Sequence, residues 1–275
     1  MMRRYTVRTF FGECAMLILC AVFLIPIYFL VVSSFKTQAE MLESPFGIPT
    51  SLDFSNYGIA LEGINFSRHF WISVYITSIS VVLIVVFGSM AAFTIARKTN
   101  RLTKILRNYF LIGFMVPLQT TMLPLFLIMR YLNLLNTKEG LIFLHSNGAV
   151  FALFLYTGFI RAMPRDLEEA AAVDGAGPFR IFWKIVFPLL KPVTATIVIF
   201  NTIWIWNSFI LEFLFLGPTD NATLTMQVYN GVGQYENDWS IMIPVVVITT
   251  LPMVVFFLLM QRRIIGGLTT GSLKG

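Results

Sequence analysis

Six long apolar runs, separated by charged or turn-rich segments, constrain the fold of this chain more than any other feature. A helix needs about 20 mainly apolar residues to cross the hydrocarbon core of a bilayer. In lipid, only helices and closed barrels satisfy all of their backbone hydrogen bonds. The sequence therefore predicts an all-α integral membrane protein that forms a single transmembrane domain over residues 1–275. The expected spans are residues 14–32, 70–96, 106–129, 141–160, 193–216 and 241–260.

Composition agrees with this class, because only 12% of the 275 residues are charged, compared with about 25% in average soluble domains. Orientation follows from the basic residues. Sixteen of the 20 Lys and Arg residues fall on one predicted side, and only Lys36, Arg68, Arg130 and Lys138 fall on the other. Cytoplasmic loops carry the excess of basic residues, so both termini are expected in the cytoplasm. The net charge of +6 is explained in this way and does not indicate a nucleic-acid partner.

The segment 161–192, between the fourth and fifth expected spans, is too charged to lie in the membrane. Each charge at a bilayer centre costs about 2.5–3.5 kcal/mol, so we expect this segment on the cytoplasmic side. Its nine charged residues are Arg161, Arg165, Asp166, Glu168, Glu169, Asp174, Arg180, Lys184 and Lys191.

The pattern inside this segment predicts two short helices joined by a break. Leu167, Ala170 and Ala171 follow helical spacing. Gly175 is expected to end the first helix, because glycine accepts the left-handed conformation of a C-terminal turn. Pro178 suits the first position of a second helix, which is amphipathic and suited to the membrane surface. Its apolar face is Phe179, Phe182, Trp183 and Val186, and Pro188 and Pro192 are expected to close the element.

The run EEAAAVDGAG, followed by Ile185 and Pro188, resembles the EAA signature of ATP-binding-cassette importer permeases. Its spacing is similar to that of the carbohydrate-uptake, MalG-like branch, and the resemblance extends over residues 34–275. It implies that the segment contains a coupling helix that docks into a cleft of a separate ATPase subunit. The implied coupling residues are Leu167, Glu168, Glu169, Ala170, Ala171, Asp174, Gly175 and Ala176.

The same resemblance implies a function and a set of partners. The chain would be a permease subunit in a bacterial cytoplasmic membrane, translocating a sugar or oligosaccharide by alternating access. A second, homologous permease subunit, two copies of the ATPase and an external solute-binding protein would complete the transporter. The tail 261–275 is also similar to that of the family, which implies a second ATPase contact. Gly271 is followed by Ser272 and not by the lysine of a Walker motif, so this chain is not expected to be an enzyme.

Polar side chains inside the apolar runs are candidates for the solute pathway. Gln119 lies between Pro117 and Pro124, where an irregular helix is tolerated if a cavity or protein covers it. The fifth run contains Asn201, Trp204 and Asn207, and WNSFI at 206–210 resembles a sugar-permease segment. Amides bond hydroxyl groups in both directions, and aromatic rings suit sugars. The alternative is a kinked helix for Gln119, and interhelical hydrogen bonds with an interfacial aromatic belt for the fifth run.

Other functional classes are less compatible with the sequence. Cys14, Cys20, His69 and His145 show no metal-ligand spacing, and we expect neither a metal nor a cofactor. An ion-coupled secondary transporter is the main alternative. Such proteins usually place an ionisable residue at mid-membrane, whereas the acids of the apolar runs lie near their ends. A membrane scaffold without transport activity is a third possibility, which the paired prolines and polar amides make less attractive.

Overall fold

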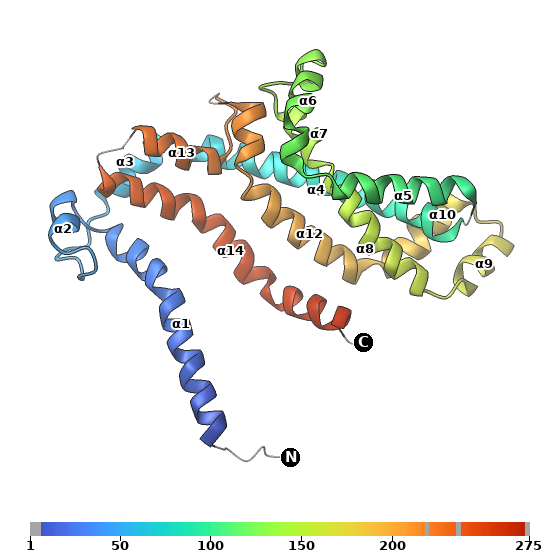
Figure 1. Ribbon diagram of the computed structural model, residues 1–275, viewed down its shortest axis with the longest axis horizontal. Helices are drawn as coiled ribbons and strands as arrows, with labels where there is room; N and C mark the ends of the chain where they lie inside the picture. Colours follow the sequence, from blue (N-terminus) through green and yellow to red (C-terminus); the bar gives the residue numbers. More distant parts are fainter. Residues whose placement is uncertain (1–6, 99, 218–219, 235–237, 273–275) are drawn as a thin grey trace. The chain divides into compact units, whose positions relative to one another are not determined.

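A computed structural model describes residues 7–98, 100–217, 220–234 and 238–272, and all regular structure in these ranges is helical (Figure 1). This confirms the predicted all-α class for the described part of the chain. The helices are α1 Val7–Ser33, α2 Gln38–Glu43, α3 Ser55–Gly63, α4 Phe66–Arg97, α5 Arg101–Met115, α6 Leu118–Tyr131, α7 Lys138–His145, α8 Gly148–Ala162, α9 Asp166–Val173, α10 Pro178–Ile181, η1 Phe182–Val186, α11 Phe187–Leu189, α12 Lys191–Trp206, η2 Glu212–Leu216, α13 Leu224–Gln234 and α14 Trp239–Ser272.

Four helical segments of the described residues are long and apolar enough to cross a membrane: Thr9–Ser33, Phe66–Arg97, Lys138–Ala162 and Trp239–Gln261. Two bent helix pairs raise the number to six if each pair is a single span. One pair is Arg101–Met115 with Leu118–Tyr131, bent by 104°, and the other is Pro178–Leu189 with Lys191–Trp206, bent by 77°. The chain is therefore a multi-pass membrane protein with four to six candidate spans.

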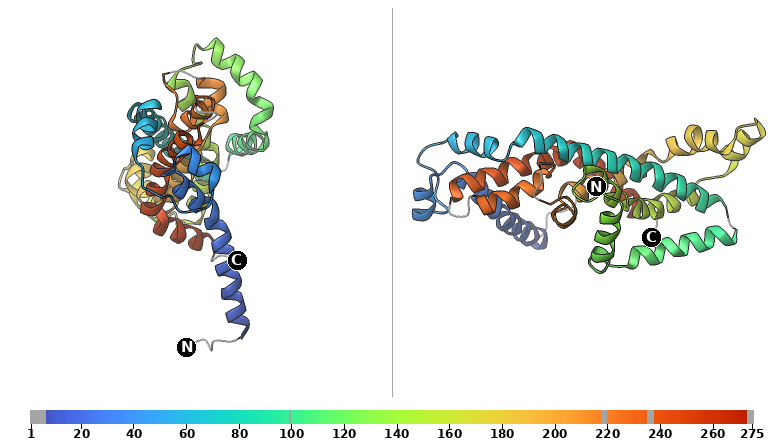
Figure 2. Two further views of the ribbon diagram at one scale, coloured as in Figure 1. Left: turned by 90° about the vertical axis from the view of Figure 1, so that its left-hand side faces the viewer. Right: turned by 90° about the horizontal axis from the view of Figure 1, so that it is seen from above.

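The helix breaks have local causes. Val116, the residue before Pro117, ends α5 in an extended conformation, because a proline disfavours the helical region for the residue before it and cannot continue the α5 ladder. Figures 1 and 2 show α6 turning sharply away from α5. The apolar run 193–216 is also interrupted: α12 ends at Trp206, and the π-helix η2 begins only at Glu212.

The chain clusters into two compact units, Met1–Phe66 with Gln227–Leu251, and Ser67–Met226 with Pro252–Gly275. In the first unit, Lys36 is 1% exposed, and it organises the loop after α1. Its ammonium donates hydrogen bonds to the carbonyl oxygens of Ser44 at 2.7 Å and Pro45 at 3.1 Å. These bonds satisfy a buried cation that would otherwise be costly.

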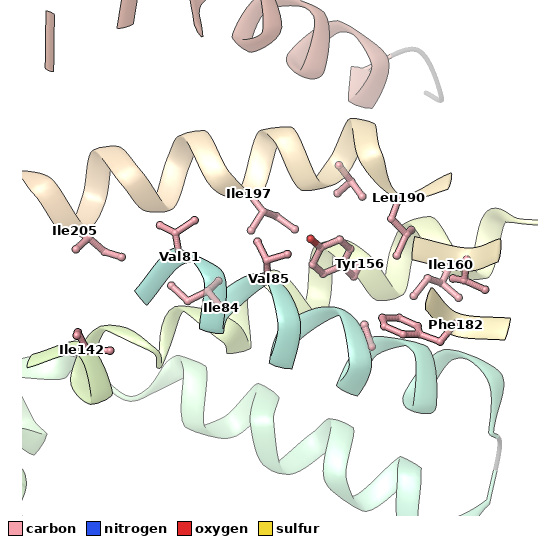
Figure 3. Packing of buried hydrophobic residues seen from close by; sticks show 14 of the residues in the cluster. Val81, Ile84, Val85, Ile142, Tyr156, Ile160, Phe182, Leu190, Ile197 and Ile205 are labelled. Atoms are coloured by element: carbon pink, nitrogen blue, oxygen red, sulfur yellow. The ribbon is translucent and has the colours of Figure 1, made fainter. Parts of the chain in front are cut away.

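The second unit contains the main hydrophobic core, in which α4 packs with α8, α12 and η1. Figure 3 shows Val85 of α4, Tyr156 of α8 and Ile197 of α12 coming together. Close approach of α4 and α8 depends on small residues, since a Cβ added to Gly88 would lie 2.7 Å from the Cβ of Ala152. Such spacing of small residues is how helices approach closely in lipid.

Candidate functional site

The segment between α8 and α12 folds as a short helix, a tight turn and a second helical stretch (Figure 1). Asp174 follows the last residue of α9, and Gly175 has a φ of +78°. The amide of Ala176 donates to the carbonyl oxygen of Ala171 at 2.9 Å, which satisfies one of the orphan carbonyls at the helix end. Pro178 then opens α10 at its first position. The break at Gly175 and the start of the second helix at Pro178 therefore lie where the sequence predicted them.

The second stretch ends between Pro188 and Pro192, the pair predicted to close it, but Pro188 does not end the helix at its own position. The helix widens into the π-helix η1, in which the amide of Phe187 bonds the carbonyl oxygen of Phe182, and helical structure continues through Pro188 to Leu189. A π-turn shifts the hydrogen-bond ladder by one residue, and prolines and π-bulges are both recognised causes of irregularity in helices. The bend occurs at Leu190, ahead of Lys191 and Pro192 in α12.

Helix α9 presents most of its surface outward, and none of its side chains is buried. Among the eight residues implied in coupling, Leu167 is 55% exposed, and Glu169, Ala170, Asp174 and Gly175 are exposed. Glu168, Ala171 and Ala176 are partly buried. The two alanines pack against the main hydrophobic core. One side of α9 is thus attached to the chain, while the other is available to a partner.

Glu168 is held by Arg97, the last residue of α4. Nε of Arg97 lies 2.9 Å and 3.0 Å from the two carboxylate oxygens, and Nη2 lies 2.6 Å from Oε1. Nη2 also donates to the carbonyl oxygen of Met163 at 3.3 Å. The two side chains are only 12% and 13% exposed, so water screens this pair less than it screens a surface ion pair.

A cavity of about 320 Å³ lies beside this pair, between α9 and the stretch formed by η1 and α11. Its lining is mainly apolar, and Glu168 is the one charged residue among those that line it. The lining residues are Met163, Pro164, Leu167, Glu168, Ile185, Val186 and Leu189.

The four predicted pathway residues fall into different environments. Asn201 is 6% exposed, and its amide donates to the carbonyl oxygen of Ile197 at 2.9 Å. It packs against α8, since a Cβ on Gly148 would meet its Oδ1 at 2.6 Å. Trp204 is 76% exposed. Asn207 is also exposed and follows the last residue of α12. Its side-chain amide donates to the carbonyl oxygen of Ile203 at 2.8 Å.

Gln119 lies in the first turn of α6, immediately after the 104° bend, and is exposed. The structure thus places Trp204 and Asn207 together near the end of α12, with Asn201 inside the helix packing. All four residues remain candidates for the solute pathway.

Two polar pairs were not anticipated from the sequence. Arg97 is one of the sixteen basic residues on the predicted cytoplasmic side, and it pairs with Glu168 across 71 positions. His145 and Glu212 form a buried pair, with Nε2 3.0 Å from Oε1 and side chains 4% and 1% exposed. Neither separation is helical, so no sequence spacing pointed to these contacts.

Within the described ranges, no group of three or more His, Cys, Asp or Glu residues is arranged to hold a metal ion.

Comparison with known proteins places these features in a family. Residues 84–264 match the family model described as "Binding-protein-dependent transport system inner membrane component". The chain is 31% identical to the probable starch degradation products transport system permease protein AmyC of Thermoanaerobacterium thermosulfurigenes, over 99% of this chain and 100% of that protein. It is 36% identical to the melibiose/raffinose/stachyose import permease protein MelC of Bacillus subtilis, over 95% of each.

A solved structure has a similar fold. It is the crystal structure of a bacterial ABC transporter involved in the import of the acidic polysaccharide alginate, with a TM-score of 0.80 at 23% identity. The match covers 94% of this chain and 99% of that chain. At this identity the likeness concerns the fold alone, while the family model and the relatives match the sequence itself. The chain belongs to the family of inner-membrane components of binding-protein-dependent transport systems.

Proposed function

We propose that this chain is a permease subunit of an ATP-binding-cassette importer that carries a sugar or oligosaccharide across the cytoplasmic membrane. The observation that carries the proposal is full-length similarity to permeases whose names specify carbohydrate uptake. AmyC and MelC each match over at least 95% of both chains. The multiple sugar-binding transport system permease protein MsmG of Streptococcus mutans is 36% identical over 91% of this chain.

The transporter would contain this chain, a second homologous permease, two copies of an ATPase and a solute-binding protein outside the cell. With both termini in the cytoplasm, α9 and the turn at Gly175 would face the ATPase. The exposure of Leu167, Glu169 and Ala170 supports this role, because a docking surface has to be accessible in the isolated chain. The tail 261–275 would provide a second contact with the ATPase.

Transport would follow alternating access. Closure of the ATPase dimer would move the 165–187 element and rock the six spans of a single permease domain around a solute site. Trp204 and Asn207 suit an uncharged, hydroxyl-rich solute, since an indole face packs on a sugar ring and an amide both donates and accepts hydrogen bonds. An ion-coupled secondary transporter is not favoured, because the matching relatives are permeases of transport systems in a binding-protein-dependent family.

Reconstitution tests this function directly. The chain would be co-expressed with its partner permease and ATPase, placed in liposomes with the binding protein, and supplied with labelled oligosaccharides. We expect uptake that requires ATP and the binding protein. Uptake driven by an ion gradient in the absence of the ATPase would contradict the proposal. Uptake of non-carbohydrate solutes alone would remove its sugar component.

A further inference from the structure

Arg97 and Glu168 connect α4, a candidate membrane span, with α9, which lies in the proposed coupling element. Arg97 is the last residue of the 32-residue helix α4, and Glu168 lies in the first turn of α9. We propose that this pair, here called the Arg97–Glu168 clamp, transmits movement of α9 to α4 during transport. The inference rests on the proposed function and assigns a positioning role to Arg97, which does not touch solute or nucleotide.

The geometry of the clamp suits the transmission of force. Both nitrogens of Arg97 that contact Glu168 do so at 2.6–3.0 Å, and a fork of this kind restricts orientation as well as distance. A fourth hydrogen bond, to the carbonyl oxygen of Met163, fixes the same guanidinium to the connection between α8 and α9. The charges also match the helix ends, because a cation is favoured at the C-terminus of α4 and an anion at the N-terminus of α9.

Packing alone gives α9 a weak attachment. None of its side chains is buried, and the cavity of about 320 Å³ separates Leu167 from Ile185 and Leu189 on one side. Side chains that line this open pocket lack protein contacts on that side, so a push on α9 could deform it before it moves the helix bundle. The clamp instead ties α9 to α4 beside this pocket, with three short hydrogen bonds to Glu168.

The clamp also separates the roles of two neighbouring glutamates. Glu168 points into the chain and is 13% exposed, whereas Glu169 is exposed. Glu169 is therefore the residue available to an outside partner, and Glu168 holds the element to α4. Loss of Glu168 would leave the docking surface in place but loosen its connection to the spans.

The test uses the full complex in liposomes and compares the wild type with Arg97→Ala, Arg97→Lys and the double exchange Arg97→Glu/Glu168→Arg. The coupling ratio, solute transported per ATP hydrolysed, is the main readout. Coupling free energies of 1–3 kcal/mol correspond to about 5–150-fold effects, so we expect the ratio to fall about fivefold or more in Arg97→Ala, with ATP hydrolysis retained. Arg97→Lys keeps the charge but loses the forked hydrogen bonds, so its coupling ratio should lie between those of the wild type and Arg97→Ala.

Hydrogen exchange of the α9 amides in the same complexes provides a second readout, which we expect to accelerate in Arg97→Ala. The single exchanges Arg97→Glu and Glu168→Arg are measured alongside, and the double exchange should recover part of the ratio lost in each of them. Lys98→Ala is the matched control, because Lys98 is the adjacent basic residue and is exposed. An unchanged coupling ratio in Arg97→Ala, or equal losses in Arg97→Ala and Lys98→Ala, would overturn the clamp. A wild-type complex without ATP-driven uptake would instead refute the proposed function.

Discussion

Replacement of Gly175 by alanine isolates the contribution of one backbone conformation to coupling. The φ of Gly175 is +78°, and no atom lies within 4 Å of an added Cβ. A steric clash within the chain is therefore excluded as the cause of any effect. The remaining cost is the left-handed backbone itself, about 1–2 kcal/mol for an L-residue other than glycine. Such a cost changes the ratio of the native turn to its unfolded alternatives by about 5–30-fold.

Gly177 provides a matched control in the same turn. It also has no atom within 4 Å of an added Cβ, but its φ is −69°, which any residue adopts. We expect Gly175→Ala to lower ATP-driven uptake in liposomes while membrane insertion and basal ATP hydrolysis persist. Gly177→Ala should behave like the wild type. Gly175→Asn should recover much of the loss, because asparagine tolerates the left-handed region better than alanine.

Gly175→Asp extends the same reasoning to the docking surface. Aspartate tolerates the left-handed backbone, but it adds a second carboxylate beside the exposed Asp174. We expect it to uncouple transport with insertion intact. Equal uptake in Gly175→Ala and Gly177→Ala would refute the argument from backbone conformation. Normal uptake in Gly175→Asp would refute the docking role of the turn.

Three further predictions concern other parts of the chain. Asn207→Ala should change the rate or the preference of oligosaccharide uptake without loss of ATPase assembly, and an unchanged uptake profile would remove Asn207 from the pathway. Gly88→Val should destabilise the α4–α8 contact, because the added Cβ would lie 2.7 Å from the Cβ of Ala152. Overpacking of this kind costs about 1–3 kcal/mol. An unshifted midpoint of thermal unfolding would contradict this prediction. A hydrogen bond from the side chain of Thr50, followed by backbone hydrogen bonds, lowers the pKa of Glu40 below its usual 4.5. This contact therefore stabilises the loop after α1 above that pH and is lost as pH falls through the lowered pKa. Hydrogen exchange of the amides of residues 38–54, corrected for the intrinsic pH dependence of exchange, should therefore be faster in acid, and Glu40→Gln should abolish this increase. An equal increase in both proteins would exclude it.

Several features of the candidate site could be predicted because they depend on neighbouring residues only. Gly175 and Pro178 carry strong local preferences, and the turn and the helix start occur at these positions. Pro188 shows the limit of such reasoning. A proline removes one amide donor wherever it occurs, but a helix can shift its hydrogen-bond ladder ahead of it. Here η1 does so, and the helical stretch continues to Leu189.

The polar residues of the fifth apolar run show a second limit. Asn201 and Asn207 are both amides within one hydrophobic run, so composition does not distinguish their environments. In the structure, Asn201 packs against Gly148 of α8, whereas Asn207 is exposed beyond the end of α12. Which amide faces a neighbouring helix depends on the packing of α4, α8 and α12, and no single helix encodes it.

The sequence by itself determined the membrane class, the apolar runs and the break at Gly175, because hydrocarbon thickness, backbone hydrogen bonding and glycine geometry act over short stretches of chain. Only the tertiary structure brought Arg97 to Glu168 and His145 to Glu212, over separations of 71 and 67 residues. Such contacts form when helices from distant parts of the chain pack together, and the energy of each pair depends on the burial that this packing creates.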